Sequence, residues 1–181
     1  MSRDEVLEVL FRVFRDRGFE GATISEIAKA CGLGKASLYH HFPAGKDAML
    51  DALVSTVLRR LDEDAFAPLR GIDAPKIRIR AVIEGFGRYL DGGERNCLIG
   101  VLSLGTARTR IGVQVNSYLT RWLAGLSELY EAAGLSHKRA VRAAREMIVR
   151  LQGAVVVSRM LDNIDTFEQT SKRLIRELEK I

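Results

Sequence analysis

The spacing of apolar residues along the chain has the period of an α-helix almost throughout. In residues 3–17, four large apolar side chains fall on one face of such a helix: Leu7, Leu10, Phe11 and Phe14. No segment alternates apolar and polar residues as a half-buried strand does. Further helices are expected at about residues 46–66, 75–91, 98–107, 112–133, 137–162 and 166–180. The sequence therefore predicts an all-α fold.

Residues that cap or stop helices divide the N-terminal segment into three helices. Gly18 is placed to end the first helix, because glycine readily adopts a positive φ. Thr23 and Glu26 have the spacing of a capping box, which begins the second helix. We expect that helix to end at Gly32 and the third to end before Pro43.

The spacing across these helices is typical of a helix-turn-helix. A small residue at Ala28 allows the two helices to approach closely, and Gly32 supplies the positive φ of the turn. The inner faces are then buried by Ile27, Leu33 and Leu38. Residues 35–41 project outward on a short helix that fits the major groove of DNA.

The chain is expected to form two domains. Residues 1–48 form the helix-turn-helix domain, and residues 49–181 form a larger helical domain. Pro68 and Pro75 bracket a short linker, and Asp165 with Glu168 predicts a second capping box at the start of the last helix.

Charge adds a local observation to this pattern. The formal net charge is +5, but residues 1–48 carry seven Lys and Arg against seven Asp and Glu. No acidic residue occurs between Glu26 and Asp47, whereas Lys29, Lys35 and two histidines do. This window is basic enough for an anionic partner such as nucleic acid. A solvated charged surface would show the same pattern, so charge matters here only together with the motif.

Several classes of protein are disfavoured. Residues 1–14 carry charges every third or fourth position, whereas a secretory signal needs an apolar stretch there. No apolar run approaches the roughly 20 residues of a membrane helix. Cys31 and Cys97 lie far apart, which suggests neither a disulfide framework nor a paired-thiolate metal site. We therefore expect a cytoplasmic protein without membrane contact.

Catalytic and cofactor sites are not expected either. The segment Gly32–Ser37 fails as a phosphate-binding loop, because Lys29 stands where its first glycine belongs and Ala36 follows Lys35. With three histidines in the chain, and His40 beside His41 pointing in different directions, a histidine metal site is improbable. The expectation is a protein with no enzyme activity, no metal and no cofactor.

The N-terminal segment resembles the TetR family of bacterial regulators. The matching residues are Ala22-Thr23-Ile24-Ser25-Glu26-Ile27-Ala28, Cys31-Gly32-Leu33, Ser37-Leu38-Tyr39-His40-His41-Phe42 and Lys46, within residues 6–50. A weaker likeness at Asn96-Cys97-Leu98-Ile99-Gly100 resembles the subgroup of the LmrA and YxaF repressors.

The resemblance implies contacts with DNA. Thr23, Tyr39, His41 and Lys46 match positions that bind phosphates, while Lys35, Ala36, Ser37 and His40 match positions that face base edges. For Tyr39, a ring that caps the core is the alternative. The sequence departs from the family at Gly34, where Ser or Thr is usual, so a hydroxyl is missing at the start of the recognition helix.

The resemblance also implies a small-molecule effector site in the second domain. Apolar residues and rings with a polar end, as ligand pockets have, occur at Phe86, Tyr89, Leu90, Leu102, Tyr118, Trp122, Met147 and Leu151. Ordinary core packing is the alternative for each of them.

The last two helices predict a homodimer. Residues 147–161 carry apolar groups on more than one side, and the interior of a single subunit covers only one side. The interface residues expected are Val156, Met160, Phe167, Leu174 and Leu178. Burial of the helix within one subunit is the alternative.

These expectations combine into a transcription regulator. It would be a repressor that a small-molecule effector releases from a palindromic double-stranded DNA operator. The competing hypothesis is a helical ligand-binding or protein-interaction module that uses the motif only structurally. Salt distinguishes them, because DNA binding weakens steeply as the salt concentration rises.

Overall fold

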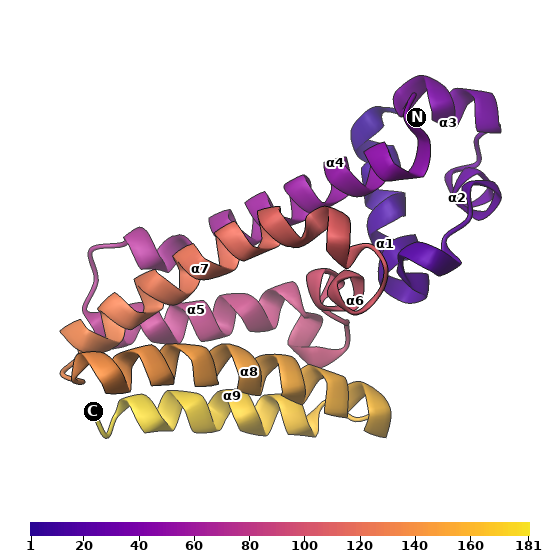
Figure 1. Ribbon diagram of the computed structural model, residues 1–181. Helices are drawn as coiled ribbons and strands as arrows, with labels where there is room; N and C mark the ends of the chain where they lie inside the picture. Colours follow the sequence, from indigo (N-terminus) through magenta and orange to yellow (C-terminus); the bar gives the residue numbers. More distant parts are fainter. The chain divides into compact units, whose positions relative to one another are not determined.

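The computed structural model describes all residues from Met1 to Ile181 and contains helices but no strand, which confirms the all-α prediction (Figure 1). The α-helices are α1 (Arg3–Gly21), α2 (Ile24–Cys31), α3 (Lys35–His41), α4 (Gly45–Arg60), α5 (Pro75–Tyr89), α6 (Leu98–Leu104), α7 (Arg108–Ala132), α8 (His137–Leu161) and α9 (Asp165–Leu178). A π-helical turn, η1 (Leu61–Ala65), continues α4, and two 3₁₀ turns follow, η2 (Ala67–Arg70) and η3 (Asp91–Gly93). No helix is both long enough and apolar enough to cross a membrane.

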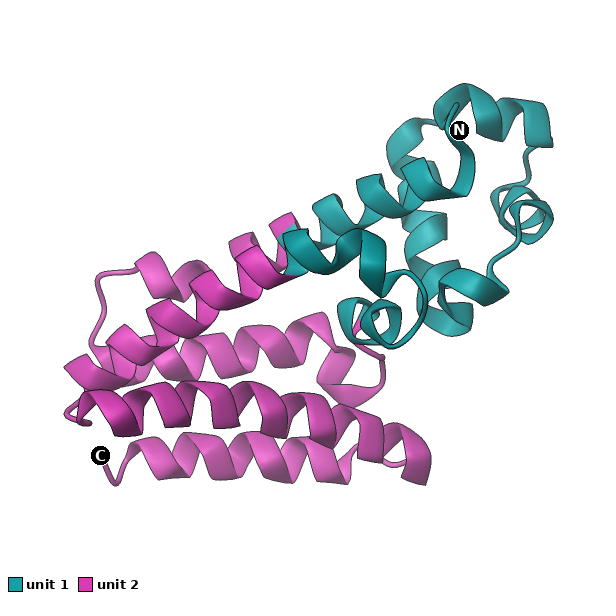
Figure 2. Cartoon of the chain, in the orientation of Figure 1, with its two compact units in different colours: residues 1–58, 98–115 teal, residues 59–97, 116–181 magenta.

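The chain folds into two compact units that do not coincide with the expected domains of residues 1–48 and 49–181 (Figure 2). Unit 1 comprises residues 1–58 and 98–115, and unit 2 comprises residues 59–97 and 116–181. The difference arises because α6 packs against α1, and because the carboxylate of Glu20 accepts hydrogen bonds from the backbone N–H and hydroxyl of Thr106. Sequence spacing alone does not reveal contacts between residues so far apart in the chain.

Within unit 1, the predicted ends of α2 at Gly32 and of α3 before Pro43 are confirmed, but the predicted end of the first helix at Gly18 is wrong. Gly18 has the expected positive φ of +68°, yet it only interrupts α1, which continues to Gly21. Gly32 is left-handed with φ +64° and ψ +26° at the end of α2. The Thr23 hydroxyl accepts the N–H of Glu26 while the Glu26 carboxylate accepts the N–H of Thr23, which completes the capping box. These short-range bonds fix where α2 begins and how the chain turns into α3.

Unit 2 contains the antiparallel pair α8 and α9, which lie side by side, with α9 also packed on α5 (Figure 1). The η1 turn packs closely on α5 because residue 85 is glycine: a Cβ there would lie 2.8 Å from the Cα of Ala65. The expected capping box of Asp165 and Glu168 is wrong. The side chain of Asn163 accepts the N–H of Asp165 instead, and Glu168 forms an ion pair with Lys172.

Candidate nucleic-acid interface

Helix α3 presents most of its side chains to solvent. Leu38 is fully buried and anchors the helix to the core of unit 1. The exposed residues are Lys35, Ala36, Ser37, Tyr39 and His40, and His41 is half-buried. The sequence predicted this outward set, and the structure places these residues together on one short helix.

Gly34 stands before this helix as its N-cap. Because glycine has no side chain, Gly34 supplies no capping hydrogen bond to the first turn, and a Cβ added there would meet no atom within 4 Å. The amides at the start of α3 therefore lack a side-chain cap. The structure has room for the Ser or Thr that is usual at this position, so the capping hydroxyl is missing only because residue 34 is glycine.

Acidic groups of unit 1 are engaged by neighbouring donors. Glu26 pairs with Arg17 as well as capping α2, and hydrogen bonds from the Thr23 N–H and hydroxyl lower the pKa of its carboxyl. Arg110 binds Asp51 with an Nη2–Oδ2 distance of 2.6 Å and Asp47 with an Nη1–Oδ2 distance of 3.2 Å. These carboxylates are therefore partly neutralised by their own neighbours.

The basic side chains of the window are not engaged in the same way. Lys29 and Lys35 are exposed and form no ion pair in the structure. The segment between Glu26 and Asp47 therefore presents exposed cationic side chains, and the two carboxylates that flank it in the sequence, Glu26 and Asp47, are paired with arginines. Such a surface attracts an anionic polymer.

Lys46 has a role that the sequence did not predict. Its Nζ donates a hydrogen bond of 2.8 Å to the carbonyl oxygen of Phe19 and lies 4.3 Å from the centre of the Phe19 ring. The side chain is half-buried and connects the start of α4 to the end of α1.

The Tyr39 ring packs against Gly45, where an added Cβ would lie 3.5 Å from the ring. Tyr39 is nevertheless 45% exposed, so it both packs and faces solvent.

Four of the predicted pocket residues of unit 2 belong to one aromatic cluster. Its centre is Phe66, which stacks on Trp122 with ring centres 4.1 Å apart and lies edge-on to Phe86 with ring centres 6.5 Å apart. The ring centres of Tyr89 and Phe86 are 6.1 Å apart, and those of Tyr118 and Trp122 are 5.7 Å apart. Sequence reasoning missed Phe66 because it follows the irregular η1 turn, where helical spacing no longer shows which face a residue occupies.

The other pocket residues lie in the core. Leu90, Met147 and Leu151 are fully buried in unit 2. Leu102 is also buried, but in unit 1, so it does not belong to the aromatic cluster. Met147 lines a different, smaller cavity together with Tyr130. The sequence therefore identified buried positions correctly without showing which of them share a site.

One carboxylate holds the aromatic cluster in place. Asp62 accepts hydrogen bonds from the Trp122 indole N–H at 2.8 Å and from Arg121 at 3.0 Å, and its second oxygen accepts from Arg70 at 3.1 Å. Burial by itself would raise the pKa of Asp62, but the bond from Trp122 and the two arginines outweigh it and lower the pKa below its ordinary value. The carboxylate thus joins η1, η2 and α7.

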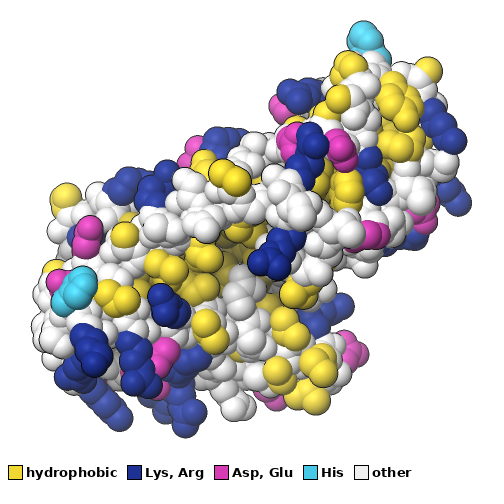
Figure 3. All heavy atoms as spheres, in the orientation of Figure 1, with side chains coloured by type: hydrophobic (Ala, Val, Ile, Leu, Met, Phe, Trp, Pro, Cys, Tyr) yellow, Lys and Arg dark blue, Asp and Glu magenta, His cyan; other side chains and the backbone are white.

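The second half of α8 exposes large apolar residues. Val149, Val156 and Met160 are 63%, 52% and 79% exposed, and Val157 and Leu161 beside them are also exposed. We call these five residues the α8 stripe. Hydrophobic side chains gather at the connected ends of α8 and α9, and Lys and Arg gather at the opposite end (Figure 3). Two apolar sides of α8 were predicted, and both are present, since Met147, Leu151 and Val155 are buried on the inner side.

The prediction that residues of α9 form the dimer interface is wrong. Phe167, Leu174 and Leu178 are 3%, 5% and 4% exposed, because α9 packs on α5 and α8 within the same chain. A Cβ at Gly93 would lie 2.7 Å from the Cβ of Phe167, which shows how closely this ring is enclosed. The error arose because a helical apolar face looks the same in sequence whichever surface covers it.

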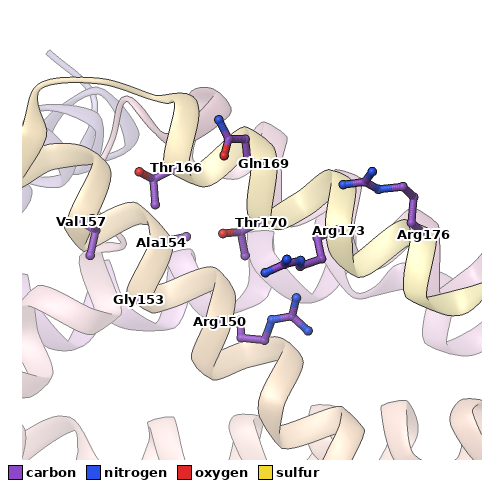
Figure 4. A pocket seen from close by; sticks show the side chains of 9 residues that line it. All are labelled: Arg150, Gly153, Ala154, Val157, Thr166, Gln169, Thr170, Arg173 and Arg176. Carbon is purple, nitrogen blue, oxygen red and sulfur yellow. The ribbon is translucent and has the colours of Figure 1, made fainter.

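A groove of about 590 Å³ runs between α8 and α9 next to the stripe. Its polar lining is Arg150, Thr166, Gln169, Thr170, Arg173 and Arg176, and Gly153, Ala154 and Val157 form the rest. The guanidinium groups of Arg150 and Arg173 point into the same space (Figure 4). Arg150 also binds Glu177, and this hydrogen bond lowers the pKa of the Glu177 carboxyl.

Comparison with known proteins identifies relatives of the N-terminal segment. Residues 6–53 match the model of the bacterial regulatory proteins of the tetR family. The transcriptional repressor KstR2 of Rhodococcus jostii is 37% identical over 82 residues, which cover 45% of this chain and 38% of KstR2. The regulator LmrA of Bacillus subtilis is 22% identical over 161 residues, covering 87% of this chain and 86% of LmrA. The first relative is therefore matched over less than half of its length.

Solved structures match over nearly the whole chain. A TetR transcriptional regulator from Legionella pneumophila has a TM-score of 0.84 at 16% identity, covering 98% of this chain and 97% of that one. AibR, solved in complex with isovaleryl coenzyme A and operator DNA, has a TM-score of 0.70 at 23% identity, covering 96% and 95%. At these identities the likeness shows the fold.

Proposed function

Because the chain belongs to the TetR family of bacterial regulatory proteins, we propose that it is a transcription regulator that binds operator DNA through α3. The observation that carries this proposal is the outward face of α3. Five of its residues are exposed, no acid lies between Glu26 and Asp47, and the flanking carboxylates are bound by neighbours. A short helix with this charge and exposure fits the major groove. The family consists of regulators rather than enzymes.

The residues of the interface would divide into two kinds. Lys35, Ala36, Ser37 and His40 would face base edges, and Thr23, Tyr39, His41 and Lys46 would contact phosphates. Two of the groups proposed to contact phosphates already form hydrogen bonds within the protein. The Thr23 hydroxyl already bonds to Glu26, and the Lys46 ammonium already bonds to Phe19, although each retains further hydrogen-bonding capacity.

We further propose that the protein is a homodimeric repressor on a palindromic operator. The α8 stripe supports the dimer, because a contiguous exposed apolar surface of this kind is typical of an interface. A two-fold dimer would bind two half-sites spaced by about one turn of DNA or a multiple of it.

We also propose that a small molecule releases the repressor from its operator. Two observations support this: aromatic rings and polar groups gather in unit 2 around Trp122, and the similar protein AibR was solved with a coenzyme A thioester and operator DNA. We expect the protein to act in the cytoplasm, where such ligands and DNA meet.

Selection of bound fragments from the host genome tests DNA binding directly. The expected result is a small set of related sites with two inverted halves, and binding that weakens steeply with salt. If no genomic fragments were enriched and any residual affinity for DNA did not depend on salt, the result would instead favour the ligand-binding or protein-interaction module.

The role of α3 is tested by His40→Ala, with Lys29→Ala on α2 as control. Both side chains are exposed. His40→Ala should weaken binding to the operator more than to random DNA, by roughly 1–3 kcal/mol of discrimination. Lys29→Ala should weaken both about equally. If His40→Ala weakened binding to the operator and to random DNA equally, as expected for Lys29→Ala, base recognition by His40 would be contradicted.

A further inference from the structure

A second cavity in unit 2 lies between the end of α7, the first half of α8 and the end of α9. Its volume is about 150 Å³, and it shares no residue with the aromatic cluster around Phe66. The apolar part of its lining is Leu135, Ala143, Met147, Leu174, Leu178 and Ile181. A cavity of roughly this size, lined by aliphatic side chains, accommodates an apolar group about as large as benzene.

The buried polar residue of the lining is Tyr130, which is 4% exposed. Its hydroxyl donates a hydrogen bond of 3.9 Å to the thioether sulfur of Met147, which also lines the cavity. Because a thioether is a weak acceptor, a ligand oxygen would form a stronger bond with this hydroxyl. Burial raises the pKa of Tyr130 to about 12, so the phenol remains a hydrogen-bond donor at neutral pH.

The charged residues at the edge of the cavity favour an anion. Glu177 is bound by both terminal nitrogens of Arg150, at 2.6 and 3.2 Å, and Glu146 is bound by Arg142 at 2.6 Å. Arg139 also lines the cavity, and it is exposed and forms no ion pair. The lining therefore offers the guanidinium of Arg139 without a carboxylate partner, while the side-chain carboxylates of Glu146 and Glu177 are already paired.

We propose that this cavity binds a small carboxylic acid in its ionised form, with an apolar chain of up to about six carbons. The chain would lie among Leu135, Met147 and Leu178, and the carboxylate would pair with Arg139 and accept a hydrogen bond from Tyr130. An amine of the same length would meet the Arg139 cation, and an alcohol would lack the ion pair. The ligand's regulatory role rests on the proposed function, whereas its binding does not.

Isothermal titration of the full chain with hexanoate, hexanol and hexylamine tests the site without DNA. Because so small a ligand binds weakly, on the order of millimolar, the titration uses concentrated protein. Hexanoate should bind roughly ten-fold more tightly than hexanol, and hexylamine should not bind. No heat with hexanoate, or equal binding of all three, would overturn the proposal.

Variants locate the binding. Arg139→Gln and Tyr130→Phe should each weaken hexanoate roughly ten-fold, since each removes a hydrogen bond to a charged group. Ala143→Phe should abolish binding by filling the cavity, with helicity and melting temperature checked to show that it folds. The control is Arg145→Gln, which removes an exposed arginine of α8 that does not line the cavity. Unchanged binding in Ala143→Phe, or an equal loss in Arg145→Gln, would place the ligand elsewhere.

The regulatory role is tested separately on operator DNA. If hexanoate acts as an effector, it should release the wild-type protein from the operator but not release Arg139→Gln at the same concentration. Binding of hexanoate without release would overturn the effector role and leave the binding site intact. Failure of the protein to bind any DNA would contradict the proposed function and would not affect the titration.

Discussion

At the scale of single residues, Lys46 shows how a side chain predicted to contact phosphate also stabilises the fold. Its ammonium bonds to the Phe19 carbonyl and lies over the Phe19 ring. Lys35 offers a comparison, because it is exposed and has no ion pair. The two lysines therefore separate a proposed DNA contact that plays no part in the fold from one that also stabilises unit 1.

Lys46→Ala should lower the free energy of unfolding by about 1 kcal/mol and reduce the salt dependence of DNA binding by roughly one unit. Lys35→Ala should alter DNA binding without altering stability. Chemical denaturation and salt titrations of both variants measure these effects. Wild-type stability for Lys46→Ala would mean that the contact with Phe19 contributes nothing to folding.

Asp62 gives a prediction about acid stability. Its carboxyl has a pKa below the ordinary value in the folded state, so the charged form stabilises the fold above the unfolded-state pKa. That contribution is lost as the pH falls through the folded-state pKa. The difference in unfolding free energy between wild type and Asp62→Asn should therefore shrink as the pH falls from neutral towards the acid range.

Trp122 reports this transition, because it is the single tryptophan of the chain and its indole N–H bonds to Asp62. Denaturation followed by tryptophan fluorescence at several pH values measures the difference. A difference that stays constant with pH would show that the charge of Asp62 does not stabilise the folded state.

At the scale of elements, the start of α2 depends on the Thr23–Glu26 capping box. Thr23→Ala removes the hydroxyl that accepts the Glu26 N–H and donates to its carboxylate. The loss should be about 1 kcal/mol of unfolding free energy. Ser25→Ala is the control, since Ser25 is exposed in the same turn and its side chain does not cap the helix. Thermal unfolding of both compares the cap with an ordinary surface hydroxyl.

The last two helices, α8 and α9, show how far an element can be predicted from sequence. The apolar periodicity of residues 137–162 predicted α8, and its two apolar sides are present. The same periodicity in α9 was assigned to a dimer interface, whereas α5 and α8 cover it within the chain. Periodicity shows that a face is buried but carries no information about what buries it.

At the scale of the whole molecule, the exposed α8 stripe predicts a dimer in solution. Val156→Asp should place an unpaired charge in the interface and shift the protein towards monomer. Operator binding should fall with it, because each monomer would then bind only one half-site. Sedimentation at micromolar concentration measures the assembly state. The control is Val113→Asp, because Val113 on α7 is 86% exposed and lies outside the α8 stripe.

Leu174→Asp, which the sequence would also suggest as an interface variant, should instead unfold the chain, because Leu174 is 5% exposed. A wild-type chain that sediments as a monomer and still binds its operator tightly would contradict both the interface and the palindromic operator.

Local interactions let the sequence by itself determine the helical class, the ends of α2 and α3 and the outward residues of α3. The capping box joins residues three apart, and the turn depends on the positive φ of a single glycine. The tertiary structure alone decided the contacts between distant segments. Examples are the joining of α6 to α1, the stacking of Phe66 on Trp122, the cavity beside Tyr130 and the intrachain covering of Phe167 and Leu174. The physical reason is that hydrophobic burial is non-directional, so an apolar face specifies that it will be covered but not by which partner.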